Sequence, residues 1–132
     1  MLLADLDYNK TTHDEGIDLI KKLKLKSISL IIKELVSLYK YLYNVTPYQI
    51  NCGMCEDFGS DIIDILPECE GYWEDELVED FDYDKDIGGT HYFVCYKGKY
   101  YDSECPEGVE DWKQLPAFMN NAALEKAAGW NL

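Results

Sequence analysis

The chain has 132 residues and a formal net charge of −14, and all 12 of its Lys and Arg positions are lysine. Hydrophobic residues make up 47% of the sequence and aromatic residues 14%, so we expect a packed core and no extended disorder. The negative charge argues against nucleic-acid binding, which needs a basic surface to face the phosphates. The lack of arginine removes the bidentate guanidinium contact that recognises phosphate or carboxylate groups.

The sequence predicts a single domain, residues 1–132, in the cytoplasm. No Gly/Ser-rich or Pro-rich linker divides the chain. The first residues, MLLADLD, reach acidic side chains before any useful hydrophobic stretch, so we expect no export signal. No apolar run approaches the ~20 residues that span a membrane. Five cysteines without such a signal indicate free thiols in a reducing compartment.

The charge is unevenly distributed along the chain. Residues 1–51 contain seven lysines and six acidic residues, whereas residues 56–90 contain fourteen acidic residues and only Lys85 as a cation. One interpretation is a solvated acidic surface that aids solubility. The other is a rim that attracts a cationic substrate or a basic partner protein.

Three helices are expected in the first half of the chain. Residues 14–26 form a short amphipathic pattern with acids first and lysines last. A second helix covers 29–45, with Ser27 or Ser29 as its cap and Pro47 as its stop. A third begins near Gly53 and runs to Pro67. Residues 1–46 are thus a helical N-terminal part, and we assign them only a packing role.

The second half is expected to contain a loop, a hairpin and a final helix. Residues 68–89 are acidic and aromatic, and we predict a loop with one helical turn. Aromatic and β-branched residues flank Lys97-Gly98, which fits a tight turn in a hairpin over 91–104. The tail should be helical from Ala117 and pack through Phe118, Met119 and Leu124.

The predicted hairpin has a defined register. With Lys97 and Gly98 as the turn, Tyr96 faces Lys99, Val94 faces Tyr101 and Phe93 faces Asp102. The alternation of side chains then puts His91, Phe93 and Cys95 on one face, together with Tyr100 and Asp102. His91 and Asp102 become diagonal neighbours.

The segment QINCGMCEDFGSD, residues 49–61, places Cys52 and Cys55 three residues apart and permits several kinds of site. A thioredoxin-type dithiol is disfavoured because no strand precedes it. A zinc site could draw on Cys52, Cys55, Cys69, His91, Cys95 and Cys105, but only one close ligand pair exists. The acidic run DFDYDKD fails as an EF-hand loop, because its sixth and twelfth positions hold Lys85 and His91.

A thiolate nucleophile is the remaining possibility. A helix N-terminus and a nearby imidazolium both lower the pKa of a thiol, and Cys55 lies in the first turn of the third predicted helix. His91 is the candidate base, because His13 lies in a helix-entry loop where a capping or exposed role is more common. Asp102 across the hairpin is positioned to orient the His91 ring. A single strand histidine is commonly structural, but nucleophile, base and orienter in this order form a narrower pattern.

These residues resemble the papain-like cysteine peptidase superfamily. CGMCEDF, residues 52–58, is similar to the papain-type motif Cys-Gly-small-Cys-aromatic-x-Phe, whose second cysteine is the nucleophile and maps to Cys55. Gln49, six residues earlier, falls at the position of the oxyanion-hole glutamine. The resemblance implies that Cys52, disulfide-bonded in secreted members, is a buried thiol in a cytosolic chain.

The transglutaminase-like branch of the same superfamily offers a second resemblance. GMCEDFG (53–59) and GTHYFVCYKGKYYDSECPEG (89–108) look like its nucleophile motif and its histidine and aspartate strands. In this comparison His91 is the base and Asp102 the orienting residue. Gly59 stands where alanine or serine is common.

The resemblance therefore implies an α+β fold, with N-terminal helices and a nucleophile-bearing helix packed on a small antiparallel sheet and a papain-like core over 47–132. The implied function is a thiol hydrolase or acyltransferase acting on an amide, isopeptide or ester bond, with Cys55, His91 and Asp102 as the triad and Gln49 in the oxyanion hole. We expect no cofactor or metal, no nucleic acid or membrane partner, and a protein or peptide substrate, a cationic one if the acidic rim acts on it. The alternative is a non-catalytic acidic binding or inhibitor protein on the same fold, of viral, phage or plasmid origin, that recognises a basic partner.

Overall fold

A computed structural model describes residues 12–77 and 91–119 and confirms the α+β class. The α-helices in these ranges are α1 (His13–Leu23), α2 (Ile28–Tyr43), α3 (Pro47–Gly53), α4 (Cys55–Ile65) and α5 (Glu74–Leu77), and a 3₁₀ helix, η2, covers Trp112–Gln114. The strands are β1 (Glu70–Trp73), β2 (Tyr92–Tyr96), β3 (Lys99–Asp102) and β4 (Cys105–Val109). They form one antiparallel sheet in the order β1-β2-β3-β4.

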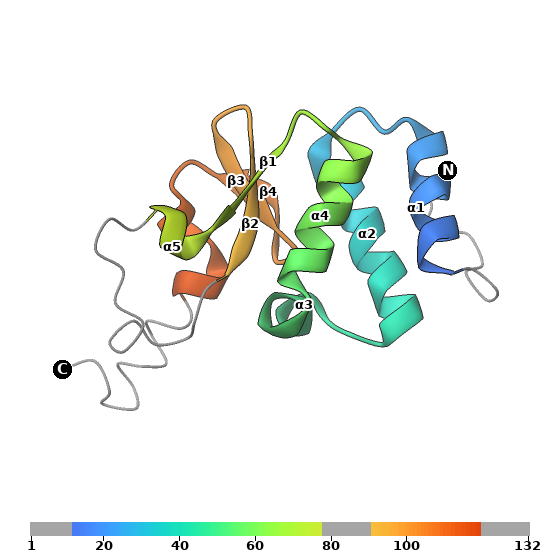
Figure 1. Ribbon diagram of the computed structural model, residues 1–132, viewed down its shortest axis with the longest axis horizontal. Helices are drawn as coiled ribbons and strands as arrows, with labels where there is room; N and C mark the ends of the chain where they lie inside the picture. Colours follow the sequence, from blue (N-terminus) through green and yellow to red (C-terminus); the bar gives the residue numbers. More distant parts are fainter. Residues whose placement is uncertain (1–11, 78–90, 120–132) are drawn as a thin grey trace.

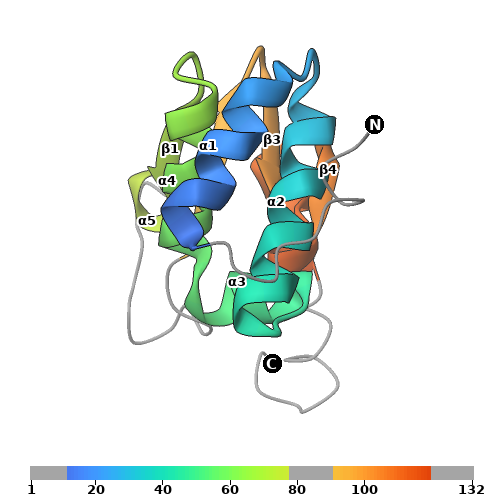
Figure 2. The ribbon, with the colours of Figure 1, turned by 90° about the vertical axis from the view of Figure 1, so that its right-hand side faces the viewer.

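Helices α1, α2 and α4 lie on one face of the sheet (Figure 1). Seen from the helical side, α4 crosses in front of β1, α2 lies in front of β4, and α1 lies outermost between them (Figure 2). The short helix α3 lies at the end of this layer, where α2 finishes and α4 begins. The N-terminal helices thus share one layer with the helix that carries Cys55.

One hydrophobic core joins the helices and the sheet. Ile20 of α1, Leu35 of α2, Ile62 of α4 and Val94 of β2 are all buried in the same cluster. The spacing of the apolar residues in α2 gives it a buried stripe along its length, as the sequence predicts. Because α2 packs on both α4 and β4, the N-terminal part supports the position of the nucleophile helix.

The first two helices end earlier than the sequence predicts. Ser27, one of the two expected caps, caps α2 by accepting a hydrogen bond from the Leu30 N–H. Helix α1 ends at Leu23 and α2 at Tyr43, and the residues that follow, Lys24 (φ 49°) and Asn44 (φ 54°), are left-handed. Pro47 instead begins α3, because proline at the first helical position loses no intrahelical hydrogen bond. Helix α3 was missed for this reason.

The hairpin is confirmed, and the sheet is larger than predicted. Lys97 (φ 49°) and Gly98 (φ 79°) form the turn, and Val94 pairs with Tyr101 as expected. Strand β1 lies where a loop was predicted, and α5 is the expected helical turn. Strand β4 lies in a segment to which the sequence analysis assigned no element. The register shifts between Tyr100 and Asp102 where β4 joins. The predicted loop over 78–89 and Leu124 of the predicted tail helix lie outside the described residues.

The close contact between α4 and β2 requires a glycine. A Cβ atom at Gly59 would lie 2.6 Å from the Tyr92 ring, and a Cβ at Gly71 would collide with the Tyr92 hydroxyl. The Tyr92 ring also packs against Trp73, so it has little freedom to move aside. Gly59 therefore lets α4 approach the strand that follows His91, which explains why a larger residue does not stand there.

Candidate active site

A break between two helices places the Cys55 thiol. Thr46 and Gln49 form a capping box at the start of α3, which ends at Gly53. Met54 leaves helical geometry with φ −128° and ψ 18°, and Cys55 is the first residue of α4. Met54 supplies no side-chain cap, so the sulfur of Cys55 lies at an open helix N-terminus. The predicted position of Cys55 at a helix start is confirmed.

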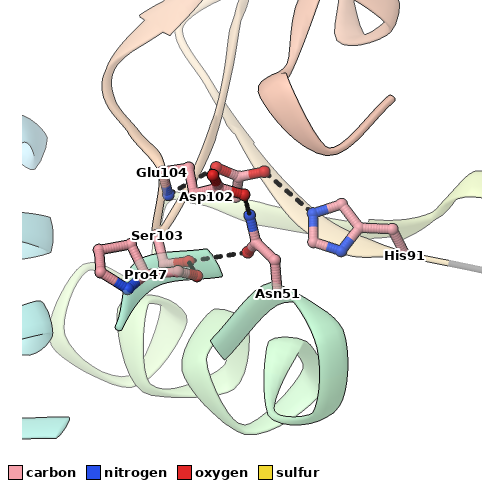
Figure 3. Close-up of polar contacts among 6 residues, drawn as sticks. All are labelled: Pro47, Asn51, His91, Asp102, Ser103 and Glu104. Carbon is pink, nitrogen blue, oxygen red and sulfur yellow. Dashed lines mark hydrogen bonds and ion pairs between the residues drawn. The ribbon is translucent and has the colours of Figure 1, made fainter. Parts of the chain in front are cut away.

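The His91 and Asp102 side chains meet at the other side of the site. His91 immediately precedes β2 and Asp102 ends β3, and the paired strands bring them together as the predicted register requires. His91 Nε2 lies 2.9 Å from Asp102 Oδ2 (Figure 3). Both residues are buried, with 6% and 3% of their surface exposed. The aspartate therefore fixes the ring through Nε2 and leaves Nδ1 for another partner.

The Cys55 thiol interacts with this ring. His91 Nδ1 is buried without a hydrogen-bond partner among the described residues, but the ring and the thiol lie close enough to shift each other's pKa. Burial raises the pKa of Cys55, but the interaction with His91 and hydrogen bonds from the backbone of Tyr92 and Glu56 outweigh this effect, so the pKa is lowered overall.

The pKa of His91 changes in the opposite direction. Burial lowers it, yet the hydrogen bond to Asp102, the interaction with Cys55 and the charges of both groups raise it to about 9. A thiol with a lowered pKa beside an imidazole with a raised pKa favours proton transfer from sulfur to nitrogen. The two groups therefore titrate as one coupled system.

Three polar residues that the sequence did not indicate hold Asp102 in place. The Glu104 N–H donates to Asp102 Oδ1 at 2.9 Å, so both carboxylate oxygens are bonded. Asn51 of α3 donates to Glu104 Oε1 at 2.8 Å and accepts from the Ser103 hydroxyl at 2.8 Å. Ser103 also lies 2.7 Å from the Pro47 carbonyl. Figure 3 shows how this network ties α3 to the turn after β3.

Aromatic side chains pack against the His91 ring. Phe118 makes an edge contact with His91 at 5.5 Å, and Phe93 lies 6.0 Å from it. Trp112 in turn stacks on Phe93 and meets Phe118 edge-on. Phe118 was expected to pack in the tail, but its contact with the candidate base was not foreseen. This cover excludes water and strengthens the His91–Asp102 interaction.

Gln49 has a structural role that the sequence analysis did not include. It is exposed on α3, and its Oε1 accepts a hydrogen bond from the Thr46 N–H at 2.9 Å. This bond uses the amide oxygen and fixes the side chain, whereas the amide NH₂ is the group that an oxyanion needs. The oxyanion role of Gln49 stays a prediction.

Cys52 contradicts the expectation of a buried thiol, because it is exposed near the end of α3. Helix α3 turns Ile50 into the core, and the side chain two residues later consequently points outward. All five cysteines are free thiols. Within residues 12–77 and 91–119, no three His, Cys, Asp or Glu side chains are arranged to hold a metal ion.

His13 occupies a separate cluster between helices. Its Nδ1 lies 2.7 Å from the Tyr43 hydroxyl and its Nε2 lies 2.8 Å from Asp61 Oδ2. These contacts link α1 to α2 and α4 and leave His91 as the histidine that meets Cys55.

Comparisons of the chain with protein-family models, with curated proteins and with solved structures find no match. None of the helices in the described part of the chain combines the length and hydrophobicity needed to cross a bilayer. The assignment of the site therefore depends on its geometry.

We predict that iodoacetamide alkylates Cys55 at pH 6, well below the ~8.5 pKa of free cysteine. The substitution His91→Gln keeps a polar group beside Asp102 but removes the imidazolium, so burial then raises the pKa of Cys55. Because one pKa unit changes the thiolate fraction tenfold, the rate at pH 6 should fall by at least about tenfold. Peptide mass spectrometry measures the rate at each cysteine.

Cys69 is an internal control, because burial raises the pKa of its thiol to about 11 and it should react last. Reaction of all five cysteines only at high pH would contradict the ion pair and favour the non-catalytic binding protein.

Proposed function

We propose that the protein is a thiol hydrolase or acyltransferase that uses a Cys55–His91–Asp102 triad on an amide, isopeptide or ester bond. The observation that carries the proposal is the buried His91 ring, bonded to Asp102 through Nε2 and interacting with the Cys55 thiol. The proposed nucleophile begins α4, the proposed base immediately precedes β2, and the proposed orienting carboxylate ends β3.

The first half of the reaction forms a thioester. The Cys55 thiolate attacks the carbonyl carbon, and the electrons of the carbonyl double bond move to the oxygen. The tetrahedral intermediate then collapses, the bond to the leaving amine or alcohol breaks, and the leaving group takes the proton from His91 Nδ1. Asp102 stays ionised and holds the Nε2–H throughout.

The second half releases the acyl group. Water, or an amine in the case of acyl transfer, attacks the thioester carbonyl while neutral His91 accepts its proton. The carbon–sulfur bond breaks and restores the thiolate beside the imidazolium. The Cys55 backbone N–H and the Gln49 amide are proposed to stabilise the oxyanion in both steps. The similarity of CGMCEDF to papain-type motifs and of 89–108 to the transglutaminase-like branch supports a papain-like core for this chemistry.

An activated ester tests the proposal without knowledge of the natural substrate. We predict that p-nitrophenyl acetate acetylates Cys55, with one p-nitrophenolate released rapidly per protein, followed by slower turnover. The burst should vanish in Cys55→Ala. In His91→Gln at pH 6 the rate of the burst should fall at least about tenfold, because the pKa of Cys55 rises and its thiolate fraction falls. Stopped-flow absorbance measures the burst, and intact-protein and peptide mass spectrometry locate the acetyl group. Acetylation of lysines or of other cysteines in place of Cys55 would refute the proposal.

The Gln49 role is tested by separating its two functions. Gln49→Glu keeps the oxygen that caps α3 but removes the NH₂ donor, so we predict a loss on the order of 10²–10³ in kcat with unchanged stability. Thr46→Ala is the matched control: it removes a cap hydrogen bond and should lower the free energy of unfolding by about 1 kcal/mol. The donor at Gln49 is retained, so turnover should persist. If Gln49→Glu turns over the substrate at the wild-type rate, Gln49 does not stabilise the oxyanion.

A further inference from the structure

A cavity of about 510 Å³ opens between α2, the start of α3 and the turn after β3. Its walls are mainly apolar and come from Val36, Pro47, Tyr48 and Pro106, with Lys33 and Glu104 as its charged residues. The volume lies within the range of small-ligand sites, which combine apolar walls with a few placed polar groups.

The two charges of the cavity are not equivalent. Lys33 Nζ lies 2.9 Å from Glu107 Oε1, so its positive charge is compensated by a residue outside the cavity lining. Ser29 donates to the same Glu107 oxygen at 2.9 Å and holds that carboxylate in place. The cavity therefore has no unpaired cation among the described residues that line it.

Glu104 carries the remaining charge. Its Oε1 accepts from the neutral Asn51 amide, and no ion pair forms to it among the described residues. Hydrogen bonding and charge from Cys52 and then burial raise the pKa of Tyr48, and the charge of Glu104 adds a smaller increase, which indicates that Glu104 lies near the Tyr48 hydroxyl. The Tyr48 ring is 52% exposed and offers a π-face to a cation. The cavity thus has an apolar body and a negative end.

We propose that this cavity binds the side chain of a lysine in a peptide substrate. The aliphatic stem would pack on Val36 and Pro106, and the ammonium would reach Glu104 and the Tyr48 ring. The net charge of −14 would favour the approach of such a substrate. The identification of the bound group as part of a substrate rests on the proposed function. The binding of a cation in the cavity is independent of that function.

The cavity and the catalytic triad share one turn. Ser103 and Glu104 line the cavity, while the Glu104 N–H holds Asp102 and the Glu104 side chain holds Asn51. Tyr48 and Pro47 of the cavity belong to α3, the helix that leads to Cys55. A peptide that places a lysine in the cavity would therefore lie along α3 toward the thiol.

Binding is tested with a pair of ligands that differ only at the end of the side chain. The probes are Nα-acetyl-lysine amide and Nα-acetyl-norleucine amide, titrated into the full chain and followed by ¹H–¹⁵N NMR. We expect shifts at Tyr48, Ser103 and Glu104, and binding of the lysine probe at least tenfold tighter than that of norleucine. Glu104→Gln, which keeps an acceptor for Asn51, should reduce lysine binding to the norleucine level.

Glu110→Gln is the matched control, since Glu110 is exposed, does not line the cavity and changes the net charge equally. It should leave the lysine preference intact. The inference would be overturned if the lysine and norleucine probes bound equally well, or if Nα-acetyl-glutamate amide bound more tightly than the lysine probe. It would also be overturned if Glu110→Gln weakened lysine binding as much as Glu104→Gln does. The titration is repeated in Cys55→Ala, where lysine binding should persist. Lysine binding without acetylation of Cys55 would refute the proposed function and leave the cation site standing.

Discussion

The hydrogen bond between His91 and Asp102 is the interaction on which the site depends. Both side chains are buried, and burying a charge is unfavourable unless it is paired and hydrogen-bonded. Here His91 Nε2 bonds one Asp102 oxygen and the Glu104 N–H bonds the other. The buried pair is therefore compatible with the protein interior. The negative charge of Asp102 raises the pKa of the His91 imidazole, which interacts with Cys55.

The position of the thiol depends on different constraints. The break at Met54 makes Cys55 the first residue of α4, and Gly59, one turn later, lets that helix approach the Tyr92 ring. The same approach places the Tyr92 backbone within hydrogen-bonding reach of the sulfur. A residue that forces α4 away from β2 would separate the thiol from the imidazole without changing either group.

Much of the triad could be predicted from local signals. The Lys97-Gly98 turn fixed the register of the hairpin, and this register alone made His91 and Asp102 neighbours. The third helix was expected to begin near Gly53, and α4 begins at Cys55 with Phe58 and Ile62 buried on one face. Each of these signals lies within a few residues of the feature it predicts.

The missed features depend on contacts between distant segments. Strands β1 and β4 have weak strand patterns, and their pairing with the hairpin determines them. The Asn51–Ser103 contact joins residues 52 positions apart, and no local motif indicates it. Proline occurs both after the end of a helix and in its first turn, and the sequence analysis assigned Pro47 to the end of α2. The left-handed conformation of Asn44 ends α2 before Pro47, which therefore begins α3.

The protonation state of His91 tests the central claim most directly. ¹⁵N NMR of the imidazole nitrogens reports it, and His13→Gln distinguishes the two histidines of the chain. With a pKa of about 9, both nitrogens of His91 should carry protons at pH 8, and Cys55→Ala should move the titration to lower pH. A His91 that is neutral at pH 8 and titrates identically in Cys55→Ala would contradict the account.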